Sequence, residues 1–368
     1  MVKKMKKNLL IFIDTLKPKI DGVSMFLENT LEGLTNTYNV TIIAPRYSNE
    51  KYENAKLITF PVYEIPGADY GITRVKRKII KEEVKKCYFI LNHESLSPGN
   101  ISFYGLRYAN KFKKPFFTYI HSIDFELITE LFHLPFLKKL EKKFLQVYAR
   151  WFLSRETATL VSFPTIEIIL RKIKVVGRYE IVPIGISDIF KPGKSNFSFQ
   201  DKIVIGFVGR ISREKGLDVL LNIFLQLQKK FDNLILLIVG DGPLRWKFEG
   251  KKDVKVTGFI SQNEVADYYK AMDIFVLPSI TEANSLSTLE ALKSGVCCVN
   301  SDVGAIKDYL KNEYNGYLFN ENSELEGILE KLIKDEKLRK TMGINAAKSV
   351  SEYTWENTVN SLIRVFEK

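Results

Sequence analysis

Residues 203–239 read IVIGFVGRISREKGLDVLLNIFLQLQKKFDNLILLIV, and the alternation within this stretch decides the fold class. Its apolar run 203–208 predicts a buried strand, residues 216–231 predict an amphipathic helix, and residues 234–239 predict a second strand. Two strands joined by a helix predict a parallel pair with a crossover connection. The pattern continues with a helix at 263–271, a strand at 274–277, a helix at 286–293 and a strand at 296–300. We therefore expect a doubly wound parallel sheet in the C-terminal half.

The N-terminal half shows the same alternation and predicts a second α/β domain. Its apolar and amphipathic runs lie at 9–13, 24–34, 40–43 and 116–120. Between the halves, turn-forming residues cluster at 183–193 and a polar stretch follows at 194–200, which is typical of an interdomain linker. We expect domains at 1–190 and 191–352, with a terminal amphipathic helix at 353–368 that packs back on the first domain.

Composition favours a folded protein that does not span a membrane. Of the 368 residues, 45% are hydrophobic and 27% are charged, which suits two domains with separate cores. No apolar run approaches the roughly 18 to 20 residues needed to cross a bilayer. The run at 9–13 is also too short for a secretory signal. Cys87, Cys297 and Cys298 have neither metal-ligand nor disulfide spacing, so we expect a reducing cytoplasm.

The formal net charge of +12 is concentrated in the first half of the chain. Residues 1–190 contain 30 lysines and arginines against 19 aspartates and glutamates, whereas residues 191–368 contain 25 against 24. Such asymmetry indicates that the first half faces an anionic partner. Nucleic acid, a membrane surface and an acidic acceptor are the three candidates.

An acidic pair brackets the start of a predicted helix in the stretch TEANSLSTLEA, residues 281–291. Glu282 follows the predicted strand 274–277, Asn284 or Ser285 suits the helix N-cap, and Glu290 lies within the helix. The backbone amides of Ser285, Leu286 and Ser287 suit a diphosphate, because a helix N-terminus carries unpaired donors and partial positive charge. The flanking carboxylates suit sugar hydroxyls, since ionised oxygens accept hydrogen bonds from them.

Two further turns follow predicted strands of the same half. In the first, residues 209–216 (GRISREKG), Arg210 and Lys215 provide cations that can neutralise a diphosphate leaving group. In the second, residues 239–243 (VGDGP), glycines allow the backbone to approach a ligand.

Together these motifs resemble the retaining GT-B glycosyltransferases of family 4, glycosyl transferases group 1. The shared signature is Gly-Arg followed by four residues and Lys-Gly, then Gly-x-Gly-Pro, then Glu-x7-Glu, and the likeness spans nearly the whole chain. It implies an α/β fold of two Rossmann-like doubly wound domains facing across a cleft, the first binding the acceptor and the second the nucleotide sugar.

The resemblance also implies roles for individual residues. Arg210 and Lys215 would hold the diphosphate, Glu290 the ribose hydroxyls, and Glu282 the hydroxyls of the transferred sugar. The remaining donor-site positions are Gly209, Gly242, Ser285, Leu286 and Ser287, with Gly258, Phe259 and Ile260 at the nucleobase.

In the first half the family places a glycine-rich turn where this chain reads KPKIDGVS, residues 17–24. Gly22 of the usual glycine pair is present and Asp21 replaces the other, a variant that is similar to glycolipid-forming members. His121 follows an apolar strand as the family's active-site histidine does, and would lie beside the donor sugar. Ala283 and Ser285 stand where many relatives have glycine, so we expect a stiffer loop.

The implied activity is a hexosyltransferase that moves a hexose from a UDP- or GDP-linked donor to a hydroxyl of a sugar or lipid-linked acceptor. The sequence contains no Asp-x-Asp triplet, so we expect neither a metal nor a cofactor beyond the nucleotide-sugar co-substrate. For a retaining enzyme the resemblance implies front-face substitution. A covalent carboxylate intermediate is the competing route.

A basic amphipathic segment at 136–152 has two interpretations. Its apolar stripe comprises Leu137, Leu140, Phe144, Tyr148 and Trp151, and it either covers the first sheet or lies in a membrane interface. The basic run 74–78 supports the second interpretation, from which we expect a cytoplasmic protein that docks on the inner membrane surface.

Two alternative functions remain. One is a nucleic-acid-binding protein, although the sequence contains no nucleic-acid recognition motif. The other is an inactive sugar-nucleotide-binding paralogue.

Overall fold

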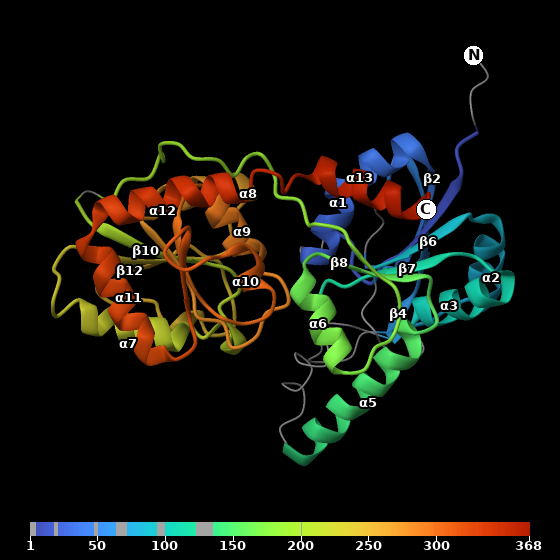
Figure 1. Cartoon of the computed structure of the whole chain (residues 1–368), viewed down its shortest axis with the longest axis horizontal. Coiled ribbons are helices and arrows are strands. Elements are labelled where there is room, and N and C mark those ends of the chain that lie inside the picture. Colours follow the sequence, from blue (N-terminus) through green and yellow to red (C-terminus); the bar gives the residue numbers. More distant parts are fainter. Residues whose placement is uncertain are drawn as a thin grey trace. The chain divides into compact units, whose positions relative to one another are not determined.

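A computed structural model describes residues 5–17, 21–47, 51–63, 72–93, 100–122, 135–199 and 201–368. The chain divides into two compact units, residues 1–185 with 355–368, and residues 186–354. Each unit has its own parallel sheet with flanking helices, as the alternating pattern predicts (Figure 1).

The N-terminal unit contains a seven-stranded parallel sheet in the order β3-β2-β1-β6-β7-β8-β9. Its strands are β1 (Asn8–Phe12), β2 (Asn39–Pro45), β3 (Ala55–Phe60), β6 (Phe89–Asn92), β7 (Phe116–Tyr119), β8 (Ala158–Val161) and β9 (Tyr179–Ile181), and β4 (Val62–Tyr63) pairs with β5 (Ile72–Thr73). Its helices are α1 (Gly22–Thr37), α2 (Arg77–Lys86), α3 (Ile101–Phe112), α5 (Pro135–Leu153), α6 (Pro164–Lys172) and α13 (Trp355–Phe366).

The C-terminal unit contains a six-stranded parallel sheet in the order β12-β11-β10-β13-β14-β15. Its strands are β10 (Ile203–Val208), β11 (Leu234–Val239), β12 (Val254–Val256), β13 (Ile274–Leu277), β14 (Cys297–Ser301) and β15 (Gly316–Phe319). Its helices are α7 (Leu217–Leu227), α8 (Gln262–Lys270), α9 (Leu286–Lys293), α10 (Ile306–Tyr309), α11 (Asn322–Lys334) and α12 (Glu336–Ser349), with 3-10 turns η2 (Arg213–Lys215) and η3 (Arg245–Lys247).

The strand order places a topological switch point in each sheet. In the C-terminal sheet the chain runs outward from β10 to β12 and then returns to place β13 against the other side of β10. In the N-terminal sheet β1 and β6 meet in the same way. Ligands of open α/β sheets bind at the carboxyl ends of the strands that flank such a point. The loops after β10 and β13 therefore define where a site is expected.

The observed elements differ from the predicted ones mainly at their ends. Strands 203–208, 234–239 and 274–277 have the predicted bounds, whereas the helix predicted over 216–231 covers only Leu217–Leu227. Gly216 lies outside this helix because its φ of +66° is left-handed. The segment before β10 belongs to the C-terminal unit, where Lys293 Nζ donates to the Ile186 carbonyl oxygen at 2.8 Å. Helix α13 packs on α1, with Val359 against Gly33.

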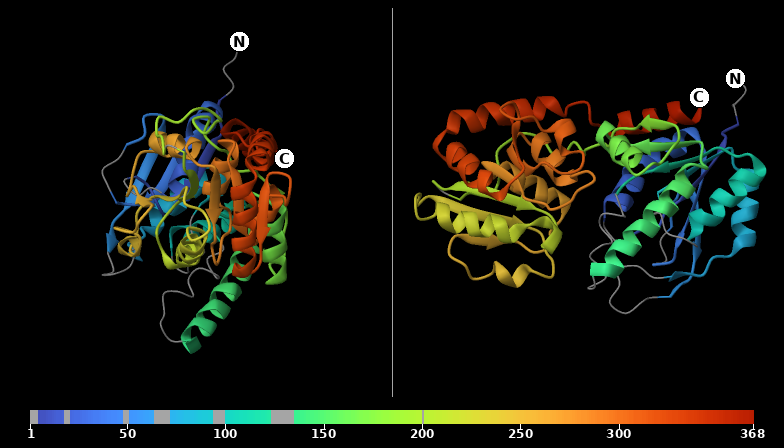
Figure 2. Two further views of the ribbon diagram at one scale, coloured as in Figure 1. Left: turned by 90° about the vertical axis from the view of Figure 1, so that its left-hand side faces the viewer. Right: turned by 60° about the horizontal axis from the view of Figure 1, so that its bottom comes forward.

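The buried face of helix α5 differs from the predicted apolar stripe. Its buried side chains are Leu145, Tyr148, Ala149, Phe152 and Leu153, whereas Leu140, Phe144, Val147 and Trp151 are exposed. Tyr148 therefore contributes to the core of its unit, and the other described members of the stripe do not. The side chain of Leu137 lies outside the described residues. Figures 1 and 2 show the N-terminal end of α5 projecting from its own unit.

Candidate active site

The loops after β10 and β13 lie against each other at the switch point of the C-terminal sheet. Gly216 ends η2 in the left-handed region, and a Cβ at this position would overlap the carbonyl oxygen of Pro278. The Ile280 amide donates to the Glu214 carbonyl oxygen at 2.8 Å. Only glycine allows this approach, which brings the segments 209–216 and 278–285 together as the motif spacing requires.

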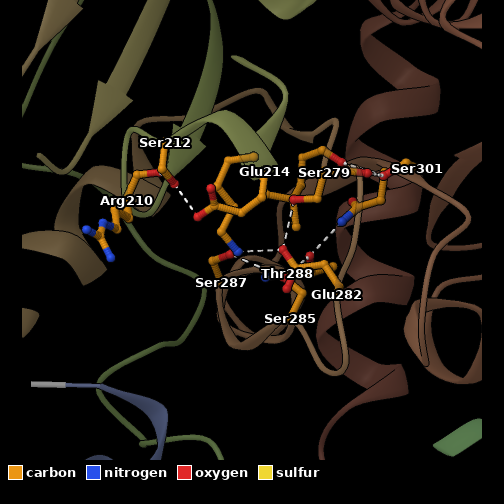
Figure 3. Close-up of polar contacts among 12 residues, drawn as sticks. Arg210, Ser212, Glu214, Ser279, Glu282, Ser285, Ser287, Thr288 and Ser301 are labelled. Atoms are coloured by element: carbon orange, nitrogen blue, oxygen red, sulfur yellow. Dashed lines mark hydrogen bonds and ion pairs between the residues drawn. The ribbon is translucent and has the colours of Figure 1, made fainter. Parts of the chain in front are cut away.

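Lys215 and Glu282 form an ion pair where these loops meet, with Nζ 2.6 Å from Oε1. Glu282 is 9% exposed, and the same carboxylate oxygen accepts a hydrogen bond from Ser279 Oγ at 2.8 Å. Ser301 Oγ donates in turn to the Ser279 carbonyl oxygen at 2.6 Å. The buried carboxylate is thus fixed in position by a cation and a hydroxyl, and Figure 3 shows it beside Ser285 and Thr288.

The N-terminus of α9 adjoins this pair, and one of the three backbone amides predicted to bind a diphosphate is already paired. Ser285 is the N-cap, its Oγ accepting from the Thr288 amide at 3.2 Å. Its own amide donates to the Tyr309 hydroxyl at 3.1 Å, so it is not available to a diphosphate. Among the described residues, no acceptor pairs with the amides of Leu286 and Ser287. Two of the three predicted donors can therefore bind an anion.

Glu290 lies on α9 and is half-buried. Burial raises the pKa of its carboxyl to about 7, and a hydrogen bond from the Tyr269 hydroxyl offsets part of that rise. The Tyr269 hydroxyl lies 3.1 Å from Glu290 Oε2 and 2.9 Å from the Ser287 carbonyl oxygen. The buried Tyr269 thereby connects Glu290 to the first turn of α9. No motif in the sequence marks this tyrosine, because its partner lies on a different helix.

The remaining predicted donor-site residues border the same edge of the sheet. The Ile211 amide donates to the Asp241 carbonyl oxygen at 2.8 Å, and Gly240 bridges to Gly258. The turns carrying Gly209, Gly242 and Gly258 are thereby joined edge to edge. Phe259 is 74% exposed and Ile260 is half-buried. The exposed side chain of Arg210 extends away from Glu282 (Figure 3).

The two remaining predicted residues belong to the N-terminal unit. His121 follows β7 and lies with Nε2 2.8 Å from Nδ1 of His93, which follows β6. Sequence reasoning missed His93, although it follows an apolar strand just as His121 does. Gly22 is the first residue of α1, and the neighbouring Asp21 caps that helix, its Oδ1 accepting from the amides of Val23 and Ser24 at 3.0 and 2.8 Å.

The chain folds into two α/β units with parallel sheets, which is the architecture of the GT-B class. The second unit carries a basic-acidic pair and a helix N-terminus at its switch point. The fold is similar to sucrose-phosphate synthase from Thermosynechococcus elongatus, with a TM-score of 0.78, 18% identity and 98% of each chain covered. It is also similar to HepE from Anabaena in complex with UDP-glucose, with a TM-score of 0.73, 15% identity, and 98% of this chain and 99% of that chain covered.

Residues 190–349 match the family model described as glycosyl transferases group 1. It is 27% identical to alpha-monoglucosyldiacylglycerol synthase from Acholeplasma laidlawii, over 94% of this chain and 93% of the relative. It is 23% identical to the enzyme of the same name from Streptococcus pneumoniae, over 93% and 84% of the two chains. The predicted GT-B fold and hexosyltransferase class are confirmed, and the C-terminal half of the chain matches the group 1 family model. The roles of individual residues stay predictions.

Proposed function

We propose that this enzyme transfers a hexose, with retention and without a metal ion, from a nucleoside-diphosphate donor to a hydroxyl of a lipid or lipid-linked acceptor. The observation that carries the proposal is the Lys215–Glu282 pair beside the open amides of α9. These groups supply a cation and donors for a diphosphate and an oriented carboxylate for sugar hydroxyls. HepE was solved with UDP-glucose, which makes UDP-glucose the first donor to test ahead of GDP-hexoses.

Each donor-site residue has a role that follows from its surroundings. Lys215 and the amides of Leu286 and Ser287 stabilise the negative charge that develops on the departing diphosphate. Glu282 accepts from sugar hydroxyls, and Glu290 binds the ribose. Arg210 reaches the diphosphate only if its side chain takes another rotamer, which long exposed side chains do readily.

Front-face substitution fits the geometry of Glu282 better than a covalent route does. One oxygen of Glu282 already accepts from Lys215 and Ser279, which weakens it as a nucleophile. In the front-face reaction the bond from the anomeric carbon to the phosphate oxygen breaks as the acceptor oxygen bonds to the same face of that carbon. The acceptor proton passes to the departing phosphate oxygen, which gives a nucleoside diphosphate and a glycoside.

A thermal-shift panel of UDP-, GDP- and ADP-sugars tests the donor site, because a ligand that binds only the folded state raises the melting temperature. We expect one donor class to raise it in the wild type and Glu290→Ala to abolish the shift. Glu326→Ala on α11 is the matched control and should keep it. Turnover should be unchanged by a chelator. No shift with any nucleotide sugar, or activity that requires added metal, would contradict the proposal.

The acceptor side of the proposal rests on α5. The exposed Leu140, Phe144 and Val147 alternate with Lys142 and Lys143, which suits a helix lying in the interface of an anionic leaflet. The N-terminal half carries nearly all the excess positive charge. Two relatives are named as synthases of a glycosylated diacylglycerol. Among the described residues, no helix is both long and apolar enough to cross a membrane.

Liposome co-sedimentation tests this docking surface. We expect the protein to bind vesicles containing anionic lipid more strongly than neutral vesicles, and increasingly weakly as salt is added. The double variant Leu140→Ser/Phe144→Ser should lose binding. Ile168→Ser/Val176→Ser removes two exposed apolar side chains elsewhere in the same unit and should keep it. Equal binding to anionic and neutral vesicles would rule the docking surface out.

A further inference from the structure

Two histidines lie together at the carboxyl edge of the N-terminal sheet. β6 and β7 are parallel neighbours, and His93 and His121 follow them. His93 Nδ1 lies 2.8 Å from His121 Nε2, which is the distance of a hydrogen bond between ring nitrogens. One nitrogen of this pair must donate and the other must accept.

Aromatic rings pack against both histidines, of which His93 is buried and His121 is half-buried, and favour their neutral forms. His93 is 2% exposed, and the ring of Phe26 lies 5.0 Å from the His93 ring and 5.2 Å from the His121 ring, centroid to centroid. Tyr119 packs against both imidazoles. Burial lowers the pKa of His93 well below its usual value and the pKa of His121 to about 3. Each ring therefore carries one proton at neutral pH.

The other nitrogen of His93 decides which ring donates. His93 Nε2 is buried and has no hydrogen-bond partner among the described residues. If His121 donated, His93 would carry its proton on Nε2 and bury an unpaired N–H. If His93 donates from Nδ1, its Nε2 is only an unpaired acceptor. Orphaned buried N–H groups are the rarer of the two in native structures, so the second arrangement is favoured.

We propose that His93 is a positioning residue that donates from Nδ1 and holds His121 as the Nδ1–H tautomer, presenting an N–H donor rather than a lone pair. Its consequence for catalysis rests on the proposed function and on the role that the family resemblance implies for His121, beside the donor sugar. His121 then hydrogen-bonds a sugar oxygen through Nδ1–H. It cannot take the acceptor proton at Nε2, because that lone pair already accepts from His93. This agrees with proton transfer to the departing phosphate.

Nuclear magnetic resonance of ¹⁵N-labelled protein tests the tautomer without any ligand. The chain has three histidines, and His133→Gln removes one signal as an assignment control. We expect the long-range nitrogen-to-carbon-proton couplings of both His93 and His121 to show the Nδ1–H form in the wild type. An Nε2–H form of His121 would overturn the proposal.

Two variants then separate positioning from packing. His93→Leu removes the donor and should lower kcat by about tenfold, the scale of one lost hydrogen bond, while KM for the donor stays the same. It should also give His121 a mixture of tautomers. His93→Asn places an amide donor near the position of Nδ1 and should restore most of kcat and the Nδ1–H form of His121.

The outcomes distinguish this inference from the proposed function. If no nucleotide sugar raises the melting temperature, the proposed function fails, whereas the tautomer is still read from the ligand-free protein. An unchanged kcat and tautomer in His93→Leu would overturn the positioning role. If that variant does not fold, the wild-type tautomer and the His93→Asn variant decide.

Discussion

Replacing Glu290 with glutamine should change how the stability of the ligand-free protein depends on pH. Burial raises the pKa of this carboxyl from 4.5 to about 7, so the folded state holds the proton more tightly than the unfolded state does. The contribution of Glu290 to the free energy of unfolding therefore falls as pH rises from about 4.5 to about 7 and is constant above that window. At about 1.36 kcal/mol for each unit, the loss is at most about 3 kcal/mol.

Urea unfolding at pH 5, 6, 7 and 8 measures this contribution. Glutamine has no titrating proton, so the wild type should lose up to about 3 kcal/mol relative to Glu290→Gln between pH 5 and pH 8. The altered contact with the Tyr269 hydroxyl adds an offset that is the same at every pH. Tyr269→Phe removes a hydrogen bond that lowers the pKa of Glu290 and should extend the window to higher pH. Parallel pH profiles for the wild type and Glu290→Gln would refute this reasoning.

Three further substitutions test the framework around the site by urea unfolding. Lys215→Ala leaves the buried Glu282 without its cation and should cost about 2 kcal/mol; Lys215→Ala combined with Glu282→Gln should cost less than the single change, and an equal cost would deny the coupling. Gly216→Ala should cost about 3 kcal/mol or more, because its positive φ and a neighbouring carbonyl oxygen exclude a Cβ, whereas Gly327→Ala, in an open helical position, should stabilise by about 0.5 to 1 kcal/mol. Asp21→Ala removes the cap of α1 and should cost about 1 kcal/mol; no loss would mean that water replaces the cap.

Local patterns in the sequence were enough to predict the architecture and that the candidate donor-site loops lie at one edge of the C-terminal sheet. The strands at 203–208 and 274–277 are continuous apolar runs with clear ends, and the motif residues follow them directly. Because carboxyl ends of parallel strands share one edge, placing Lys215 and Glu282 near each other required only the strand assignments. Their 2.6 Å ion pair is a result of the structure.

The hydrogen bonds of the candidate site could not be predicted from the sequence, because they join elements that are distant along the chain. The Tyr309 hydroxyl accepts a hydrogen bond from the Ser285 amide, and Asn300 Nδ2 donates to the Thr288 hydroxyl at 2.6 Å. Neither contact leaves a periodic signal, since each joins residues from different strands or helices. They also change the interpretation of the loop around Ala283 and Ser285, which the sequence predicts to be stiffer than in many relatives. Ser285 does more than restrict the backbone where relatives have glycine, because its hydroxyl accepts from both the amide and the hydroxyl of Thr288.

The N-termini of α9 and α1 differ in whether their backbone amides are paired, and this difference affects which chemical groups each helix can bind. In the C-terminal unit the first turn of α9 keeps two amides open beside Lys215, an arrangement that attracts an anion. In the N-terminal unit the Asp21 carboxylate takes the amides of Val23 and Ser24 and the hydroxyl of Thr15, and so adds negative charge where a phosphate would otherwise bind. In the proposed function, the basic side chains of this unit face an anionic leaflet, and the Asp21 turn favours a neutral hydroxyl over an anionic headgroup.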